Sequence, residues 1–86
     1  MSGEIHLKGR ALILGSGPSN PAAQEIIERA LSPFVHKIHE IQRIDLGGRT
    51  IIALTVGLDP AHFEVIVGEL ERAGADANLD IAIELQ

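Results

Sequence analysis

The residues best placed for chemistry lie in the turn-rich segment Gly15–Asn20, which leads into an amphipathic segment that begins near Pro21. If that segment is a helix, its first backbone N–H groups have no acceptor within the helix. Together with the helix dipole, such groups attract a carboxylate or a phosphate. Ser19 and Asn20 carry short polar side chains that can satisfy the same N–H groups themselves. The segment therefore predicts either an anion-binding site or a helix start that is capped by its own residues.

The four histidines give no clear metal-binding pattern. His36 and His39 are three residues apart, and strand side chains at that spacing point to opposite faces unless a bulge intervenes. The sequence contains no recognisable Ser/His/Asp catalytic pattern and no Asp-x-Asp nucleophile motif. Because it has no Cys, it also lacks thiol nucleophiles and thiolate metal ligands. We therefore expect no catalytic residue, no bound metal and no cofactor.

Composition narrows the class of partner. The 86-residue chain has a formal net charge of −5, seven Lys and Arg, two Phe and no Trp or Tyr. Nucleic-acid-binding domains need a basic surface, and RNA-binding sheets need aromatic side chains on which bases stack. No apolar run reaches the roughly 20 residues of a membrane span, and residues 1–10 lack the apolar stretch of a signal peptide. We expect a cytoplasmic location and no contact with nucleic acid or membrane.

Aliphatic patterning indicates the strands that position the turn-rich segment. Residues 4–15 and 50–56 contain continuous apolar runs, which predict two central strands. Residues 36–46 are apolar at irregular spacing and otherwise polar, which predicts an edge strand with one bulge. Gly47-Gly48 predicts a hairpin turn, and the alternation over residues 79–85 predicts the second edge strand.

Two helices are expected between these strands. Asn20 suits the N-cap of the first and Pro21 its first helical position, while Pro33 ends it. Asp59-Pro60 repeats the same start signal, and Gly74 is a candidate C-cap of the second helix. The apolar stripes are Ala23, Ile26, Ile27, Ala30 and Leu31 in the first helix, and Phe63, Ile66, Val67 and Leu70 in the second.

The resulting order is βαββαβ, and its two halves resemble each other. Tandem split βαβ units with right-handed crossovers give a four-stranded antiparallel sheet with both helices on one face. We therefore predict an α+β, ferredoxin-like sandwich. A chain of this length has room for one core, so residues 1–86 form one domain, either alone or as the N-terminal part of a longer protein.

Two motifs resemble the ACT domain family, and the likeness extends over about residues 11–85. The run Gly17-Pro18-Ser19-Asn20-Pro21-Ala22 is similar to the family's Gly-x-Asp-x-Pro-Gly turn. The run Ile38-His39-Glu40-Ile41-Gln42-Arg43 is similar to its second-strand pattern Ile-x-Asp-Ile-x-Gln. Within the family, the sequence most resembles the N-terminal regulatory domain of bacterial phosphoserine phosphatases.

The resemblance implies a non-catalytic regulatory domain that binds an amino acid, such as serine, and controls an enzyme of amino-acid metabolism. The ligand carboxylate would lie at the first N–H groups of the helix, and an acidic side chain on a neighbouring copy's edge strand would face its ammonium group. The residues implicated are Gly17, Ser19, Asn20, Ala22, Ala23, Gln24, His39 and Glu40.

The assembly expected is a homodimer that buries the first helix, the loop before it and the strand over residues 36–46. The alternative is that the charged residues of that strand keep the chain monomeric.

Ser19 and Ala22 stand where the family often has Asp and Gly. Ala22 in place of Gly favours a second hypothesis, a purely structural dimerisation module with no ligand. A third hypothesis, an acyl- or phosphoryl-hydrolase on the same fold, would need Arg10 in an anion cradle, although Arg10 precedes the core of the first strand.

Overall fold

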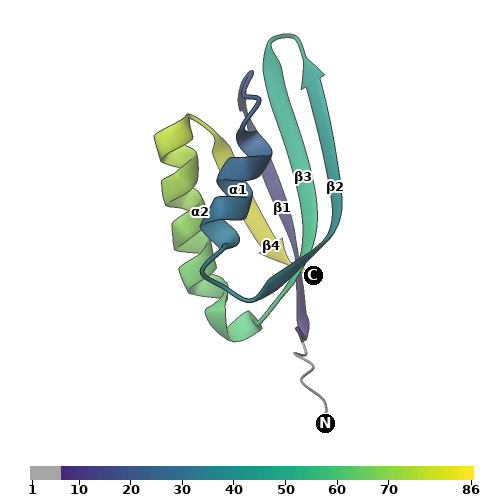
Figure 1. The fold of residues 1–86 in the computed structure, drawn as a ribbon, viewed down its shortest axis with the longest axis vertical. Helices are drawn as coiled ribbons and strands as arrows, with labels where there is room; N and C mark the ends of the chain where they lie inside the picture. Colours follow the sequence, from purple (N-terminus) through teal and green to yellow (C-terminus); the bar gives the residue numbers. More distant parts are fainter. Residues whose placement is uncertain (1–6) are drawn as a thin grey trace.

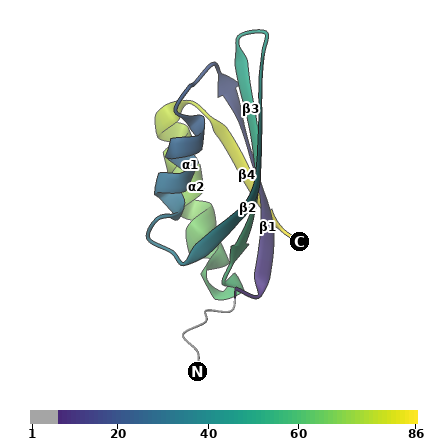
Figure 2. The ribbon, with the colours of Figure 1, turned by 45° about the vertical axis from the view of Figure 1, so that its right-hand side comes forward.

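The computed structural model describes residues 7–86, which form one antiparallel sheet covered on one face by two helices (Figures 1 and 2). The strand order is β2-β3-β1-β4. This arrangement confirms the predicted ferredoxin-like βαββαβ sandwich. The elements are β1 (Gly9–Pro18), α1 (Ala23–Leu31), β2 (His36–Leu46), β3 (Arg49–Leu58), a 3₁₀ turn (Pro60–His62), α2 (Phe63–Ala77) and β4 (Asp80–Leu85).

The core lies between the helices and the central strands β1 and β3. Alternate residues of β3 from Thr50 to Leu58 are buried under the helices, whereas Ile51, Ala53 and Thr55 face the open side of the sheet. Most residues of the predicted helix stripes supply the other half of the core, whereas Phe63 and Val67 of the second stripe are only half-buried and lie outside the core cluster. Its fully buried helix residues are Ala23, Ile27 and Leu31 from α1 and Ile66 and Leu70 from α2.

Strand β1 differs from the predicted range of 4–15. Residues 4–6 lie outside the described part of the chain, and the strand begins at Gly9 and continues to Pro18. It continues because both neighbouring strands supply partners there, with Gly17 opposite Thr50 and Ser16 opposite Asp80. The predicted turn at residues 15–18 is therefore wrong, and the connection to α1 is shorter than expected.

The start of α1 also needs correction. Ala22 occupies the N-cap position and the helix begins at Ala23, not at Pro21. The side chain of Asn20 instead closes a tight turn, in which its Oδ1 accepts a hydrogen bond from Ala22 N at 2.9 Å. Asp59 acts similarly in the second half, where its carboxylate accepts from Ala61 N at the start of the 3₁₀ turn.

The end of α2 lies one turn beyond the predicted C-cap. Gly74 is inside the helix, and Asn78 ends it with a left-handed φ of 59°. Gly74 is needed for close packing, because a Cβ there would lie 2.6 Å from the backbone oxygen of Leu79. The glycine therefore marks a contact between α2 and the start of β4.

The edge strands agree with prediction. β2 and β4 lie at the two edges, and the pairing of β2 with β3 shifts between Ile38 and Glu40, so that His39 is the bulged residue. The hairpin between β2 and β3 turns at Gly47 and Gly48, both with positive φ.

Among residues 7–86, no helix combines the length and apolar character needed to cross a membrane.

Candidate functional site

The loop between β1 and α1 is held against the tip of the β2–β3 hairpin, which projects beyond the helices (Figure 1). Ser19 N donates to the backbone oxygen of Gly48 at 2.8 Å. Asn20 N donates to Thr50 Oγ1 at 2.9 Å. The backbone of the predicted anion-binding segment is therefore held in place by hydrogen bonds to residues about 30 positions away in the sequence.

Arg43, on the edge strand β2, also forms hydrogen bonds to this loop. It lies on the helix side of β2, opposite Ile52. Its Nη2 donates to the backbone oxygen of Asn20 at 2.7 Å, and its Nη1 to that of Pro21 at 3.4 Å. The guanidinium also forms a two-pronged pair with Asp45, with Nε–Oδ2 at 2.9 Å and Nη2–Oδ1 at 3.1 Å. Because such a planar pair has a fixed geometry, it orients the guanidinium toward the loop.

Thr50 completes the arrangement beneath the loop. It is fully buried, and its hydroxyl donates to Asp45 Oδ1 at 2.8 Å while it accepts from Asn20 N. One hydroxyl thus joins the β2 ion pair to the backbone of the loop. We call Arg43, Asp45 and Thr50 the hairpin network.

The hairpin network changes the ionisation of its carboxylate. The hydrogen bonds from Arg43, and after them from Thr50, lower the pKa of Asp45 below its ordinary value, and the same pairing raises the pKa of Arg43. A carboxyl group whose pKa is lower in the folded chain stabilises the fold above its unfolded pKa of about 3.9. That contribution is lost as pH falls through the folded pKa.

We therefore expect the Asp45→Asn variant to lose less stability than the wild type as pH is lowered from about 5 to 2. Chemical unfolding at a series of pH values measures this difference. The matched control is Asp76→Asn on α2, since Asp76 forms no ion pair within residues 7–86. Equal acid sensitivity in the wild type and the Asp45 variant would contradict the role given to the network.

The predicted donor groups at the helix start are largely engaged by Asn20. Its Oδ1 accepts from Ala22 N, and its backbone oxygen accepts from Ala23 N at 3.3 Å. Gln24 directs its side chain along the helix, where Nε2 donates to Glu28 Oε2 at 2.9 Å. Two of the three N–H groups predicted to bind a carboxylate therefore already have an acceptor from the loop.

The other predicted site residues lie in different surroundings. Gly17 is buried on the helix side of β1, where a Cβ would lie 2.6 Å from the backbone oxygen of Asn78. Ser19 is exposed in the loop. His39 and Glu40 are exposed at the bulge, where His39 lies close to Gly57 and Glu40 is opposite Thr55, whereas the loop packs near Gly48 and Thr50. Within one chain the structure does not bring His39 and Glu40 to the loop.

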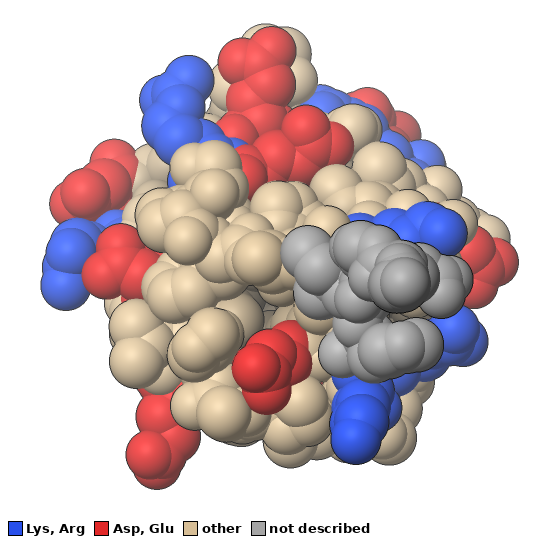
Figure 3. Space-filling model, turned by 60° about the horizontal axis from the view of Figure 1, so that its bottom comes forward, with Lys and Arg blue, Asp and Glu red and all other residues tan. Residues whose placement is uncertain are grey.

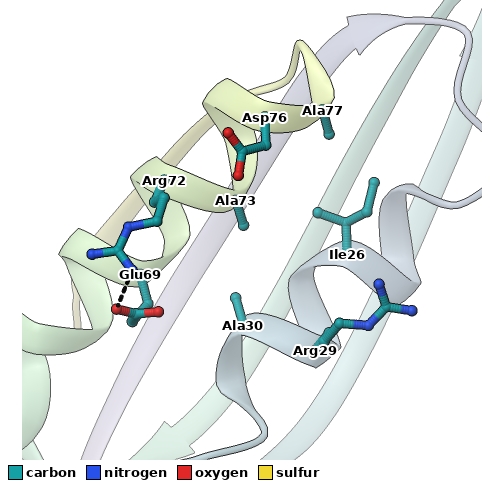
Figure 4. A pocket seen from close by; sticks show the side chains of 8 residues that line it. All are labelled: Ile26, Arg29, Ala30, Glu69, Arg72, Ala73, Asp76 and Ala77. Atoms are coloured by element: carbon teal, nitrogen blue, oxygen red, sulfur yellow. Dashed lines mark ion pairs between the residues drawn. The ribbon is translucent and has the colours of Figure 1, made fainter.

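A separate groove of about 350 Å³ lies between α1 and α2 (Figure 4). Small side chains leave it open, namely those of Ala30 on α1 and Ala73 and Ala77 on α2. Arg29 and Arg72 point away from each other at its two sides in Figure 4, and Arg72 is paired with Glu69 at 3.3 Å. No set of polar groups converges in the groove, so it does not resemble a catalytic or ligand-binding site.

Sequence reasoning missed the hairpin network, although a signal for it exists. Arg43 and Asp45 carry opposite charges at positions i and i+2, which share one face of a strand. Thr50 is a polar residue near the start of the next strand, directly before the aliphatic run Ile51-Ile52-Ala53-Leu54. With the Gly47-Gly48 turn between them, this pattern indicates a cross-strand polar cluster at the hairpin end.

No family model and no curated protein matches this sequence. Solved structures do match, among them an ACT domain protein from Streptococcus pneumoniae, with a TM-score of 0.78 at 19% identity, covering 90% of this chain and 89% of that one. A formyltetrahydrofolate deformylase from Burkholderia mallei has a TM-score of 0.78 at 15% identity, covering 88% of this chain and 28% of that one. The regulatory subunit of aspartate kinase from Thermus thermophilus has a TM-score of 0.68 at 19% identity, covering 88% and 50%.

These similarities show the fold. The βαββαβ sandwich of this chain is the same arrangement as in the ACT domain protein. The chain spans nearly the whole of that protein, about half of the kinase subunit and just over a quarter of the deformylase.

Proposed function

We propose that this chain is a regulatory domain of the ACT type, which binds a free amino acid at the loop between β1 and α1. Its fold matches an ACT domain protein and a regulatory subunit of aspartate kinase, and its two motifs resemble those of the family. The resemblance to the regulatory domain of phosphoserine phosphatases makes serine the first ligand to test, and such a cytoplasmic phosphatase the first host enzyme. The chain itself performs no catalysis.

The observation that carries the proposal is the fixed position of the loop. The hairpin network holds the backbone of Asn20 and Pro21 through Arg43 and Thr50. A loop that is ordered before binding loses less conformational entropy when a ligand arrives. The first turn of α1 is therefore presented to a carboxylate at a low entropic cost.

Binding at this loop requires one local rearrangement. Because Asn20 Oδ1 already accepts from Ala22 N, a carboxylate must replace that oxygen. Rotation of the Asn20 side chain exposes the N–H and turns the amide NH₂ toward the ligand, where it donates a second hydrogen bond. Ala22 and the backbone N–H of Gln24 would supply the remaining contacts.

The proposal includes a homodimer, because the ammonium group of the ligand needs an acidic partner. Within residues 7–86 of one chain, Glu40 is placed away from the loop, so a second copy would supply this residue. The edge strand that would associate has exposed apolar side chains at Ile41, Ile44 and Leu46, the last of them 73% exposed. An edge with this composition favours pairing with another chain over permanent exposure to water.

An NMR titration with L-serine, followed by the other common amino acids, tests the ligand. We expect backbone amide shifts in residues 19–24, together with a shift of the Asn20 side-chain NH₂ signals as the amide rotates. Ethanolamine is the matched control, since it keeps the ammonium and hydroxyl groups of serine and lacks the carboxylate. If no amino acid shifts any signal in residues 15–24, the proposed ligand site is wrong.

A second candidate function, a structural dimerisation module without ligand, is favoured by one specific observation. Asn20 already satisfies the N–H groups of Ala22 and Ala23, so the helix start needs no ligand to complete it. Sedimentation combined with thermal melting separates the two functions. A dimer whose melting temperature does not respond to amino acids supports the structural module, and a monomer at high concentration contradicts the dimer in both.

A further inference from the structure

A hollow of about 340 Å³ lies at the end of the sheet opposite the β1–α1 loop. Its wall is formed by the start of β1 and the start of β2, next to the bulge. The residues that line it are Leu7, Lys8, Gly9, Arg10, Lys37 and His39. Of the residues predicted to bind an amino acid, only His39 lines this hollow. The hollow is therefore separate from the β1–α1 loop.

Positive charge is concentrated at this hollow in a chain that is acidic overall. Lys8, Arg10 and Lys37 are three of the seven Lys and Arg in a protein of net charge −5. All three are exposed, and none forms an ion pair within residues 7–86, whereas Arg43 and Arg72 do. Figure 3 looks onto this end of the molecule, where blue side chains gather along the right-hand side.

The strand register places two of the cations in one row across the sheet. Arg10 on β1 and Lys37 on β2 both lie opposite Gly57 of β3, so the three residues form one row across the open face. Neighbouring strands are about 4.8 Å apart, so the backbones of the two cationic residues are about 10 Å apart. Since Gly57 has no side chain, the side chains of Leu7 and His39 can lie directly over it and line the hollow between the cations.

The bulge adds a fourth polar group to the same space. A Cβ on Gly57 would lie 3.1 Å from His39 Nε2 and 3.6 Å from the Leu7 side chain. The imidazole therefore lies close to Gly57, next to Lys37. Glu40 is the nearest acidic residue along β2, and it lies opposite Thr55, one step further along the sheet.

We propose that this hollow binds a small phosphate-bearing anion, at a second site separate from the proposed amino-acid site. Arg presents a planar fork that matches two phosphate oxygens, while Lys side chains add mobile point charges. Two flexible cationic side chains whose backbones are about 10 Å apart, with a third beside them, suit a phosphate or diphosphate group held between their charged ends. A long nucleic acid is a poor fit, because the net charge of −5 repels it beyond this one cluster.

Titration with inorganic pyrophosphate at constant ionic strength tests the site. In amide NMR spectra of the wild type we expect saturable shifts confined to residues 8–10, 37–39 and 57. The triple variant Lys8→Gln/Arg10→Gln/Lys37→Gln should bind at least about tenfold more weakly. The matched control Arg29→Gln/Arg49→Gln/Arg72→Gln removes the same number of charges elsewhere and should bind like the wild type.

A second variant tests the shape of the site with every charge retained. Gly57→Ala puts a methyl group 3.1 Å from His39 Nε2, so the imidazole has to move into the hollow. The substitution should therefore weaken pyrophosphate binding while circular dichroism shows an intact fold. Equal weakening in the two triple variants, or shifts at all Lys and Arg without saturation, would overturn the proposal. Tighter binding of a single-stranded oligonucleotide than of pyrophosphate would also overturn it. Shifts in residues 15–24 report on the amino-acid site alone, so the two proposals fail separately.

Discussion

Replacing Gly74 with alanine should destabilise the protein by about 1–3 kcal/mol, although alanine is the better helix former by about 1 kcal/mol. The new Cβ would lie 2.6 Å from the backbone oxygen of Leu79 and 3.1 Å from the side chain of Ile81. A backbone atom cannot move aside as a flexible side chain can, so α2 would have to shift away from β4. Urea unfolding monitored by circular dichroism measures the change in the free energy of unfolding.

The same helix contains a control for this substitution. Gly68 is exposed on α2, and a Cβ built there meets nothing within 4 Å. Gly68→Ala should therefore stabilise the protein by about 0.5–1 kcal/mol through helix propensity alone. The two alanine variants should change stability in opposite directions. If Gly74→Ala is also stabilising, the close contact between α2 and β4 is not as the structure has it.

The type and order of the elements follow from the local sequence, whereas their ends do not. The aliphatic stripes of both helices and the continuous runs of β1 and β3 predict element type and order, because burial sets their periodicity. Element ends depend on distant partners. Gly74 fits a helix end by its own preferences, but the helix continues past it because Leu79 and Ile81 pack there. β1 likewise continues to Pro18 because Arg49 and Thr50 pair with it.

In the candidate site, too, the turn could be predicted from the local sequence, but the position of Arg43 could not. Asn20 and Pro21 predict the turn before α1, since their side chains restrict the local backbone. Arg43 is placed by the register of β2 on β3, which a single bulge at His39 changes by one residue. After that shift, Arg43 and Asp45 face the helix side of the sheet. A one-residue change of register moves every later side chain to the other face, and the sequence shows only that some irregularity is needed.

Replacing Thr50 with valine should destabilise the protein by about 1–3 kcal/mol, because the substitution keeps the shape of the side chain and removes a buried hydroxyl with three partners: Asn20 N, Asp45 Oδ1 and, at 3.4 Å, Arg43 Nη2. Asn20 N would lose its acceptor, and Asp45 would lose a donor. For a domain of this size, the melting temperature should fall by roughly 4–8 °C for each kcal/mol. The loop would also lose a fixed point, so the shifts caused by an amino acid should require more ligand.

The same substitution five residues along β3 is the matched control. The hydroxyl oxygen of Thr55 is buried and has no hydrogen-bond partner within residues 7–86. A buried polar atom without a partner costs free energy, so Thr55→Val should be neutral or stabilising by up to about 1 kcal/mol. The control also separates the loss of hydrogen bonds from any general effect of valine in a strand. If both variants lose the same stability, the hydroxyl of Thr50 does not hold the loop, and the proposed preorganisation of the β1–α1 loop fails with it.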